Sequence, residues 1–142
     1  MSLESARTSR LRHARVLAGT SNPALSGAVG PIDRAHLSRY TLGSLELERE
    51  ILGLFVAQLP LSIEQLRFAV TDREWQVAAH TIKGSARAVG AGHVSQLALE
   101  AERLPAVEDE AERARILAAL EDAAETVRTY VAETFPAGGP LA

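Results

Sequence analysis

A histidine, a lysine and a glycine lie within five residues of one another in the middle of the sequence, as His80, Lys83 and Gly84. An imidazole can act as a general base, a metal ligand or a nucleophile. Lys83 is the only lysine among fifteen basic residues, which favours a local need for a compact ammonium over the alternative of mutational drift. Because neutral imidazole attacks phosphorus and an ammonium offsets charge on phosphoryl oxygens, this pair suits a phosphoryl group.

Other chemistries of histidine find less support in the sequence. The remaining histidines, His13, His36 and His93, are scattered, and no HExxH pair or cysteine accompanies them, so we expect no metal site and no cofactor. Acyl transfer needs a nucleophile, an orienting acid and an oxyanion pocket. Ser85 beside His80 on one helix does not build that arrangement.

The segment from Asp72 to Gly90 has the pattern of one amphipathic helix. With residues about 100° apart, its apolar stripe consists of Trp75, Ala79, Ile82, Ala86 and Val89. His80 lies on the opposite side, and the residues within about 60° of it are Arg73, Gln76, Lys83, Gly84 and Arg87. We therefore expect an exposed histidine rather than the buried, hydrogen-bonded histidine that is usual in apolar surroundings.

Gly84 has two interpretations. A glycine in a helix interior costs about 1 kcal/mol relative to alanine, so it is favoured where a helix ends or where a partner needs close approach. The apolar stripe continues beyond it through Ala86 and Val89, which counts against a helix end. We expect the helix to continue to Gly90 and Gly84 to leave room for a docking partner.

At these residues the sequence resembles the histidine-containing phosphotransfer (HPt) domain of two-component phosphorelays. The family pattern is a His-x-x-Lys-Gly-(Ser/Ala) string with a glycine ten positions after the histidine. It stands here as His80-Thr-Ile-Lys83-Gly84-Ser85 with Gly90, and the resemblance covers about a hundred residues from Ile32 onward.

The resemblance implies roles for individual residues. His80 is the expected phosphoacceptor, through Nε2, and Lys83 matches the lysine that steadies the phosphoryl group. A Glu or Gln that orients the imidazole in the family falls 22 positions later, at Glu102, although Glu100 lies close and a solvated surface acid is the alternative.

The same resemblance implies a partner surface around His80. Gly84 matches the small residue that admits a receiver domain, and Ser85 matches a position near the imidazole. Gln76 and Arg87 share that face, and we expect some apolar contact from an earlier short helix near His36 and Leu37.

The composition and periodicity predict the elements that carry these residues. The 142 residues suit one domain, and the abundance of Ala and Leu with only 4% aromatic residues favours helix. We expect a short helix capped by Asp33 and ending near Tyr40, then a long helix capped by Ser44 that is kinked at Pro60 and continues to Thr71. Further helices are predicted at about 72–89, 93–104 and 107–134. The expected fold is all-α, an antiparallel up-and-down four-helix bundle with a short extra N-terminal helix.

The buried stripes expected for the other long helices follow the same spacing. They are Leu52, Phe55, Leu59, Ile63, Leu66 and Val70; then Val94, Leu97, Ala98, Ala101 and Leu104; and finally Ile116 or Leu117, Leu120, Ala124, Val127 and Val131.

We expect three parts in the chain: a basic, disordered tail at 1–31, an HPt bundle at 32–134 and a C-terminal tail at 135–142. The N-terminal tail is either a solvated extension or a contact for an acidic partner or anionic lipid. A net charge of −3 and a pI near 5.8 argue against nucleic acid, and no apolar run is long enough to span a membrane. The absence of cysteine and of a secretory signal suits a cytoplasmic protein.

The combined expectation is a freestanding phosphocarrier without ATP-dependent kinase activity. It would accept a phosphoryl group on His80 from a sensor or hybrid histidine kinase, or from a receiver aspartate, and relay it to a response regulator. We expect a monomer. The alternatives are a non-catalytic helical docking or scaffold module that binds receiver domains, and a dimeric helical regulator, which lacks a positive motif.

Overall fold

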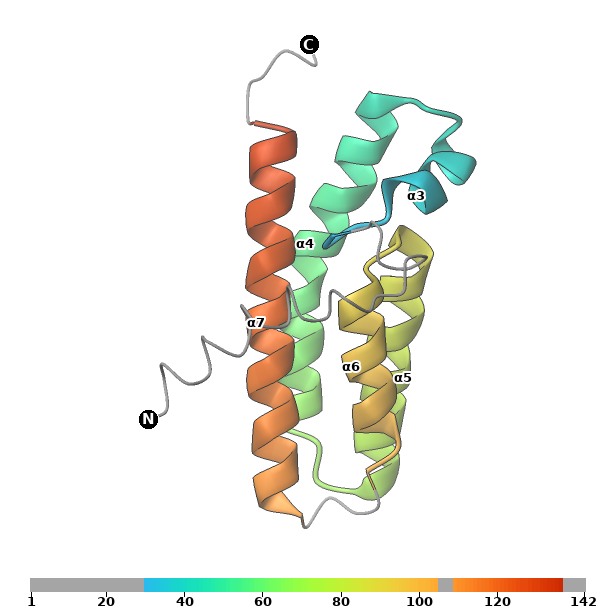
Figure 1. The fold of residues 1–142 in the computed structure, drawn as a ribbon. Helices are drawn as coiled ribbons and strands as arrows, with labels where there is room; N and C mark the ends of the chain where they lie inside the picture. The colour runs from blue at the N-terminus through green and yellow to red at the C-terminus, as the bar shows by residue number, and fades with distance from the viewer. Residues whose placement is uncertain (1–29, 105–108, 137–142) are drawn as a thin grey trace, which may run out of the picture. The chain divides into compact units, whose positions relative to one another are not determined.

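The computed structural model describes residues 30–104 and 109–136, and every regular element in these ranges is a helix. The helices are α3 (Arg34–Thr41), α4 (Leu45–Arg67), α5 (Asp72–Val89), α6 (Gly92–Glu102) and α7 (Glu110–Thr134). Helices α4 to α7 run alternately up and down, and the short α3 precedes them (Figure 1). The predicted all-α bundle with a short extra N-terminal helix is therefore confirmed.

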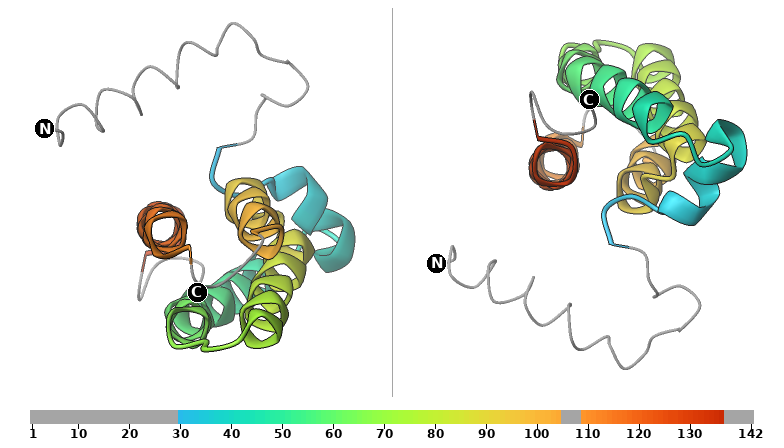
Figure 2. Two further views of the ribbon diagram at one scale, coloured as in Figure 1. Left: turned by 90° about the horizontal axis from the view of Figure 1, so that it is seen from below. Right: turned by 90° about the horizontal axis from the view of Figure 1, so that it is seen from above.

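The four long helices form a closed ring of neighbours. Helix α5 packs against α4 and α6, and α7 closes the ring by packing against the same two helices. Figure 2 shows the four helices end-on, around a shared interior. His80 belongs to α5 and Glu102 to α6, so these residues lie on adjacent, antiparallel helices.

Helices α3, α4 and α5 begin at side-chain caps that the sequence predicts. Asp33 accepts a hydrogen bond from the His36 N–H at 3.1 Å, and Ser44 accepts one from the Leu47 N–H at 3.1 Å. Thr71 caps α5 in the same way, and α5 ends at Gly90, whose φ of 82° is the left-handed conformation favoured for glycine. Helix α5 therefore has the extent that the apolar stripe predicts.

Helix α4 differs from its prediction at the C-terminal end only. It continues unbroken past Pro60, as expected, but it ends at Arg67 rather than near Thr71. Val70, predicted to be buried, is 74% exposed. The prediction was wrong because the helical spacing no longer applies once the chain has left the helix.

The core consists of the apolar stripes of the four long helices, with one shift in α7. The predicted Ala124 is only partly buried, and Ala123 takes its place at 5% exposure. Leu104 is likewise partly buried, since α6 ends two residues earlier. Phe135, which we expected in the C-terminal tail, is 8% exposed and packs in the core, so the bundle extends to it.

Helix α3 is anchored to the end of α5 by a close backbone contact. The Asp33 N–H donates to the Gly90 carbonyl at 2.8 Å, and a Cβ at position 90 would lie 2.8 Å from the Asp33 carbonyl oxygen. Ile32 and Leu37 are 2% and 1% exposed. Leu37 is therefore a core residue and does not supply the expected apolar partner contact, while a contact from the rest of this helix stays a prediction.

A part-buried ion pair joins α3 to α4. Glu48 is 2% exposed and accepts hydrogen bonds from Arg34 Nη2 at 2.7 Å and from the Thr41 hydroxyl at 3.0 Å. The Arg34 guanidinium also lies 5.2 Å from the centre of the Phe135 ring. The pKa of Arg34 is raised, chiefly by its hydrogen bond to Glu48.

Residues 1–29, 105–108 and 137–142 lie outside the described residues, so the division of the chain into a tail at 1–31, a bundle at 32–134 and a tail at 135–142 stays a prediction apart from Phe135. Among the helices that the structure describes, none combines the length and apolar character needed to cross a bilayer.

Candidate functional site

His80 lies in the interior of α5 with its side chain 67% exposed. Trp75, Ala79 and Ile82 on the opposite side of the helix are buried to 2% exposure or less. The helical spacing thus predicts the orientation of the histidine, because the stripe that faces the core leaves only one direction for residue 80.

Glu102, on the last turn of α6, holds both His80 and Lys83. Its Oε2 lies 3.0 Å from His80 Nδ1, and its Oε1 accepts a hydrogen bond from Lys83 Nζ at 2.6 Å. One carboxylate therefore joins two residues of the neighbouring helix. The other candidate, Glu100, is exposed and its charge acts on Arg115 of α7 instead.

This geometry selects one tautomer of the imidazole. An ionised carboxylate only accepts hydrogen bonds, so the Nδ1 that faces Glu102 carries the proton. In the neutral ring the lone pair then lies on Nε2, on the side away from Glu102. The arrangement presents an exposed nucleophilic nitrogen whose partner nitrogen is held by a carboxylate.

Lys83 is more enclosed than the helical wheel indicates. Its side chain is only 13% exposed, because position 83 lies on the side of α5 that faces α6 and the ammonium bonds to Glu102 there. The hydrogen bond from Lys83 is the main reason that the pKa of Glu102 lies below its ordinary value of 4.5; the bond with His80 adds to it and burial opposes it. The carboxylate is therefore ionised at neutral pH.

Gly84 leaves an open space beside His80. It lies within the unbroken α5, and a Cβ added to it would meet no atom within 4 Å. The alternative in which Gly84 ends the helix is therefore wrong. The packing of the fold therefore does not require a glycine here, and a role for Gly84 in admitting a partner stays a prediction.

The other predicted partner residues are all exposed on α5. Gln76 and Arg87 flank His80 at one turn before and two turns after it. Ser85 faces α4 instead, and its hydroxyl donates to the Thr81 carbonyl at 3.1 Å rather than to the imidazole. The Ser85 hydroxyl is therefore bonded within α5, and a role for Ser85 near the imidazole stays an implication of the resemblance.

An apolar groove that we did not predict adjoins this surface. It has a volume of about 320 Å³ between α4 and α5, and its lining includes Ser85, Ala88 and Leu54. Beside the groove residue Leu54, which is 70% exposed, other apolar side chains are exposed on α4, its C-cap and α5: Leu61, Phe68 and Val77, at 59%, 72% and 50%. The seven-residue spacing of Leu54, Leu61 and Phe68 places them on one face of α4, and this spacing could have predicted the exposed apolar residues from the sequence.

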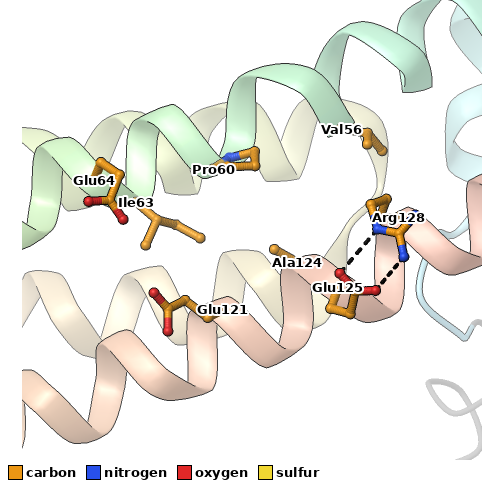
Figure 3. Close-up of a pocket in the computed structure, with 8 residues that line it drawn as sticks. All are labelled: Val56, Pro60, Ile63, Glu64, Glu121, Ala124, Glu125 and Arg128. Atoms are coloured by element: carbon orange, nitrogen blue, oxygen red, sulfur yellow. Dashed lines mark hydrogen bonds and ion pairs between the residues drawn. The ribbon is translucent and has the colours of Figure 1, made fainter.

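A second cavity, of about 220 Å³, lies between α4 and α7 (Figure 3). Its residues are Val56, Pro60, Ile63, Glu64, Glu121, Ala124, Glu125 and Arg128. Glu125 is paired there with Arg128. None of the predicted site residues lines this cavity.

Trp75 forms a hydrogen bond next to Glu102 that the sequence does not predict. Its indole N–H donates to the carbonyl oxygen of Ala101, next to Glu102, at 2.7 Å. The sequence marks Trp75 only as a core residue. In residues 30–104 and 109–136, no group of three or more His, Asp or Glu side chains gathers in a way that could hold a metal ion.

Comparison with known proteins gives one match. A family model described as Hpt domain matches residues 50–130, which include α5, α6 and most of α4 and α7. No curated protein and no solved structure matches the chain.

Proposed function

Because the chain belongs to the Hpt domain family, whose members serve histidine phosphotransfer in phosphorelays, we propose that His80 is its phosphoacceptor. The chain then receives a phosphoryl group from a receiver aspartate or a histidine kinase and passes it to the receiver of a response regulator. The observation that carries the proposal is the contact of His80 Nδ1 with Glu102 at 3.0 Å, which leaves Nε2 exposed with its lone pair.

The transfer step is a displacement at phosphorus. The Nε2 lone pair attacks, the new N–P bond forms as the acyl O–P bond of the phosphoaspartate breaks, and the aspartate leaves as a carboxylate. The ring gains positive charge in this step, and the Glu102 carboxylate at Nδ1 offsets it. In the onward step, a carboxylate oxygen of the next aspartate attacks the phosphorus, the O–P bond forms as the N–P bond breaks, and neutral imidazole leaves.

Lys83 acts on the phosphoryl group in this proposal. An ammonium has three N–H donors, and one of them bonds to Glu102. The others remain for a phosphoryl oxygen on His80, one helical turn away. Lys83 therefore offsets the negative charge of the phosphoryl group while it stays bonded to Glu102.

The receiver approaches over α5 and α4. Gly84 allows it close to Nε2, Gln76 and Arg87 offer polar contacts, and the groove beside Ser85 with the exposed apolar residues of α4 offers an apolar surface. Exposed apolar patches on soluble domains often mark sites of contact with a partner. We propose that the carrier is a monomer in the cytoplasm, where a protein without cysteine suits the reducing conditions.

The test is labelling by a phosphorylated donor. Wild-type protein incubated with phosphorylated receivers is expected to take up label that is lost in acid, as phosphohistidine is, and His80→Gln is expected to take up none. His93→Gln, which changes another exposed histidine, is the matched control and should label normally. Full labelling of His80→Gln contradicts the assignment, and binding of receivers without any labelling of wild type favours the scaffold alternative.

A further inference from the structure

The functional site depends on the position of Glu102, and a further residue must hold Glu102 against α5. Glu102 is the last residue of α6, and the backbone N–H of the C-cap Arg103 donates to the carbonyls of Leu99 and Glu100, each at 3.2 Å. The final carbonyls of a helix lack partners within it, and helix ends fray. Yet the two contacts of Glu102, at 3.0 and 2.6 Å, require its carboxylate to be held closely against α5.

Trp75 adds a restraint on this end of α6 from the neighbouring helix α5. Its indole N–H donates to the Ala101 carbonyl at 2.7 Å, and that carbonyl also accepts the Leu104 N–H at 3.1 Å. The Ala101 carbonyl belongs to the peptide unit that links Ala101 to Glu102. A buried hydrogen bond therefore fixes the backbone next to the carboxylate, and it comes from the same helix that carries His80 and Lys83.

The indole is also contacted from α7. Trp75 is 2% exposed, and the Arg113 guanidinium of α7 lies 4.7 Å from the centre of its ring. Arg113 Nη2 also donates to the carbonyl of Ala69, just after α4, at 3.0 Å. Cation–π contacts of this kind favour one ring position over others. The indole thus has little freedom to move away from Ala101.

We propose that Trp75 is a positioning residue for the phosphoryl chemistry of His80: its hydrogen bond to Ala101 sets the place of Glu102, and Glu102 sets the imidazole tautomer. The proposal rests on the proposed function for its consequence in transfer, but its structural part does not. Trp75 touches neither the imidazole nor an incoming phosphoryl group, and it acts only through Glu102.

The direct test is the tautomer of His80 in the unphosphorylated protein. The ¹⁵N shifts of the ring at a pH where histidine is neutral report which nitrogen carries the proton. Wild type is expected to hold the Nδ1–H form, and Trp75→Phe, which keeps a ring beneath Arg113 and removes the N–H, is expected to shift a measurable population to Nε2–H. Unchanged ¹⁵N shifts in Trp75→Phe would overturn the proposal.

The transfer rate gives a second readout through a double-mutant cycle. Trp75→Phe is expected to slow transfer about fivefold, the change that loss of one neutral hydrogen bond produces. In a Glu102→Gln background the same change should have no further effect, because the path through the carboxylate is already altered. Equal slowing in both backgrounds would show that Trp75 acts on stability alone.

Controls separate positioning from loss of stability. Val127→Ala removes core packing in α7 at a residue that is 3% exposed, so it lowers stability while the Trp75–Ala101 hydrogen bond is kept, and it should leave the tautomer and the rate unchanged. If Trp75→Phe does not fold, replacement of this single tryptophan by benzothienylalanine keeps the bicyclic shape and substitutes sulfur for the N–H. Labelling of His80→Gln would refute the proposed function while leaving the tautomer result intact.

Discussion

Replacing Gly84 should stabilise the fold and, at the same time, weaken the binding of a receiver domain. The residue lies within α5 at a helical φ, and an added Cβ would meet no atom within 4 Å, so Gly84→Ala gains the full difference in helix propensity, about 1 kcal/mol. For a domain of roughly 100 residues that difference raises the Tm by about 4 °C. Gly84→Gln should also melt above wild type, since glutamine is a good helix former.

Receiver binding should change in the opposite direction. The added atoms stand beside His80 on the path to Nε2, so affinity is expected to fall, and further for Gln than for Ala. Gly53→Ala is the matched control: it lies within α4, its Cβ also meets nothing within 4 Å, and it does not line the groove beside Ser85. It should gain the same stability and keep its affinity.

Calorimetry and titration of a labelled receiver measure both quantities on the same samples. If Gly84→Ala and Gly84→Gln bind the receiver as tightly as wild type does, the glycine has no part in docking. If both melt below wild type, the added side chains meet an obstacle that the open space beside Gly84 does not contain, and the reasoning from the structure fails.

Three further predictions concern other residues of the site and fold. Lys83→Ala should slow transfer or shorten the lifetime of the phosphorylated protein without abolishing either, which a time course of label measures; wild-type rates and decay would contradict its role. Gly90→Ala should destabilise the protein by more than about 1 kcal/mol, since its φ is 82° and its Cβ would lie 2.8 Å from the Asp33 carbonyl, and denaturant unfolding checks this. Because the folded protein lowers the pKa of Glu102, the stability from this group is fully present above its ordinary value of 4.5 and is lost as pH falls through the lower folded value. Glu102→Gln should therefore weaken the fall in stability with acid, and an unchanged pH–stability curve would refute the coupling.

The part of the site that sequence predicts is the part that one helix determines. His80, Gly84 and the core stripe from Trp75 to Val89 follow from a single periodicity, and the structure has them where that periodicity puts them. Periodicity fails where the helix ends, as at Val70, which follows the last residue of α4 and is exposed.

The contacts between helices could not be predicted from the sequence in the same way. Glu102 was named from a family resemblance and could not be separated from Glu100, because the rotation of α6 about its axis depends on its packing against α5. The same packing encloses Lys83 and brings the Trp75 N–H to a backbone carbonyl. A backbone acceptor carries no signal in side-chain identity, so no pattern in the sequence points to that bond.

The most direct test of the central claim is the position of the phosphorus on the imidazole ring. Wild-type protein phosphorylated by a receiver, with ¹⁵N-labelled histidine, allows heteronuclear NMR to identify the nitrogen bonded to phosphorus. Glu102 holds Nδ1, so the account predicts phosphorus on Nε2 of His80 alone. Phosphorus on Nδ1 of His80, or on any other residue, would contradict it.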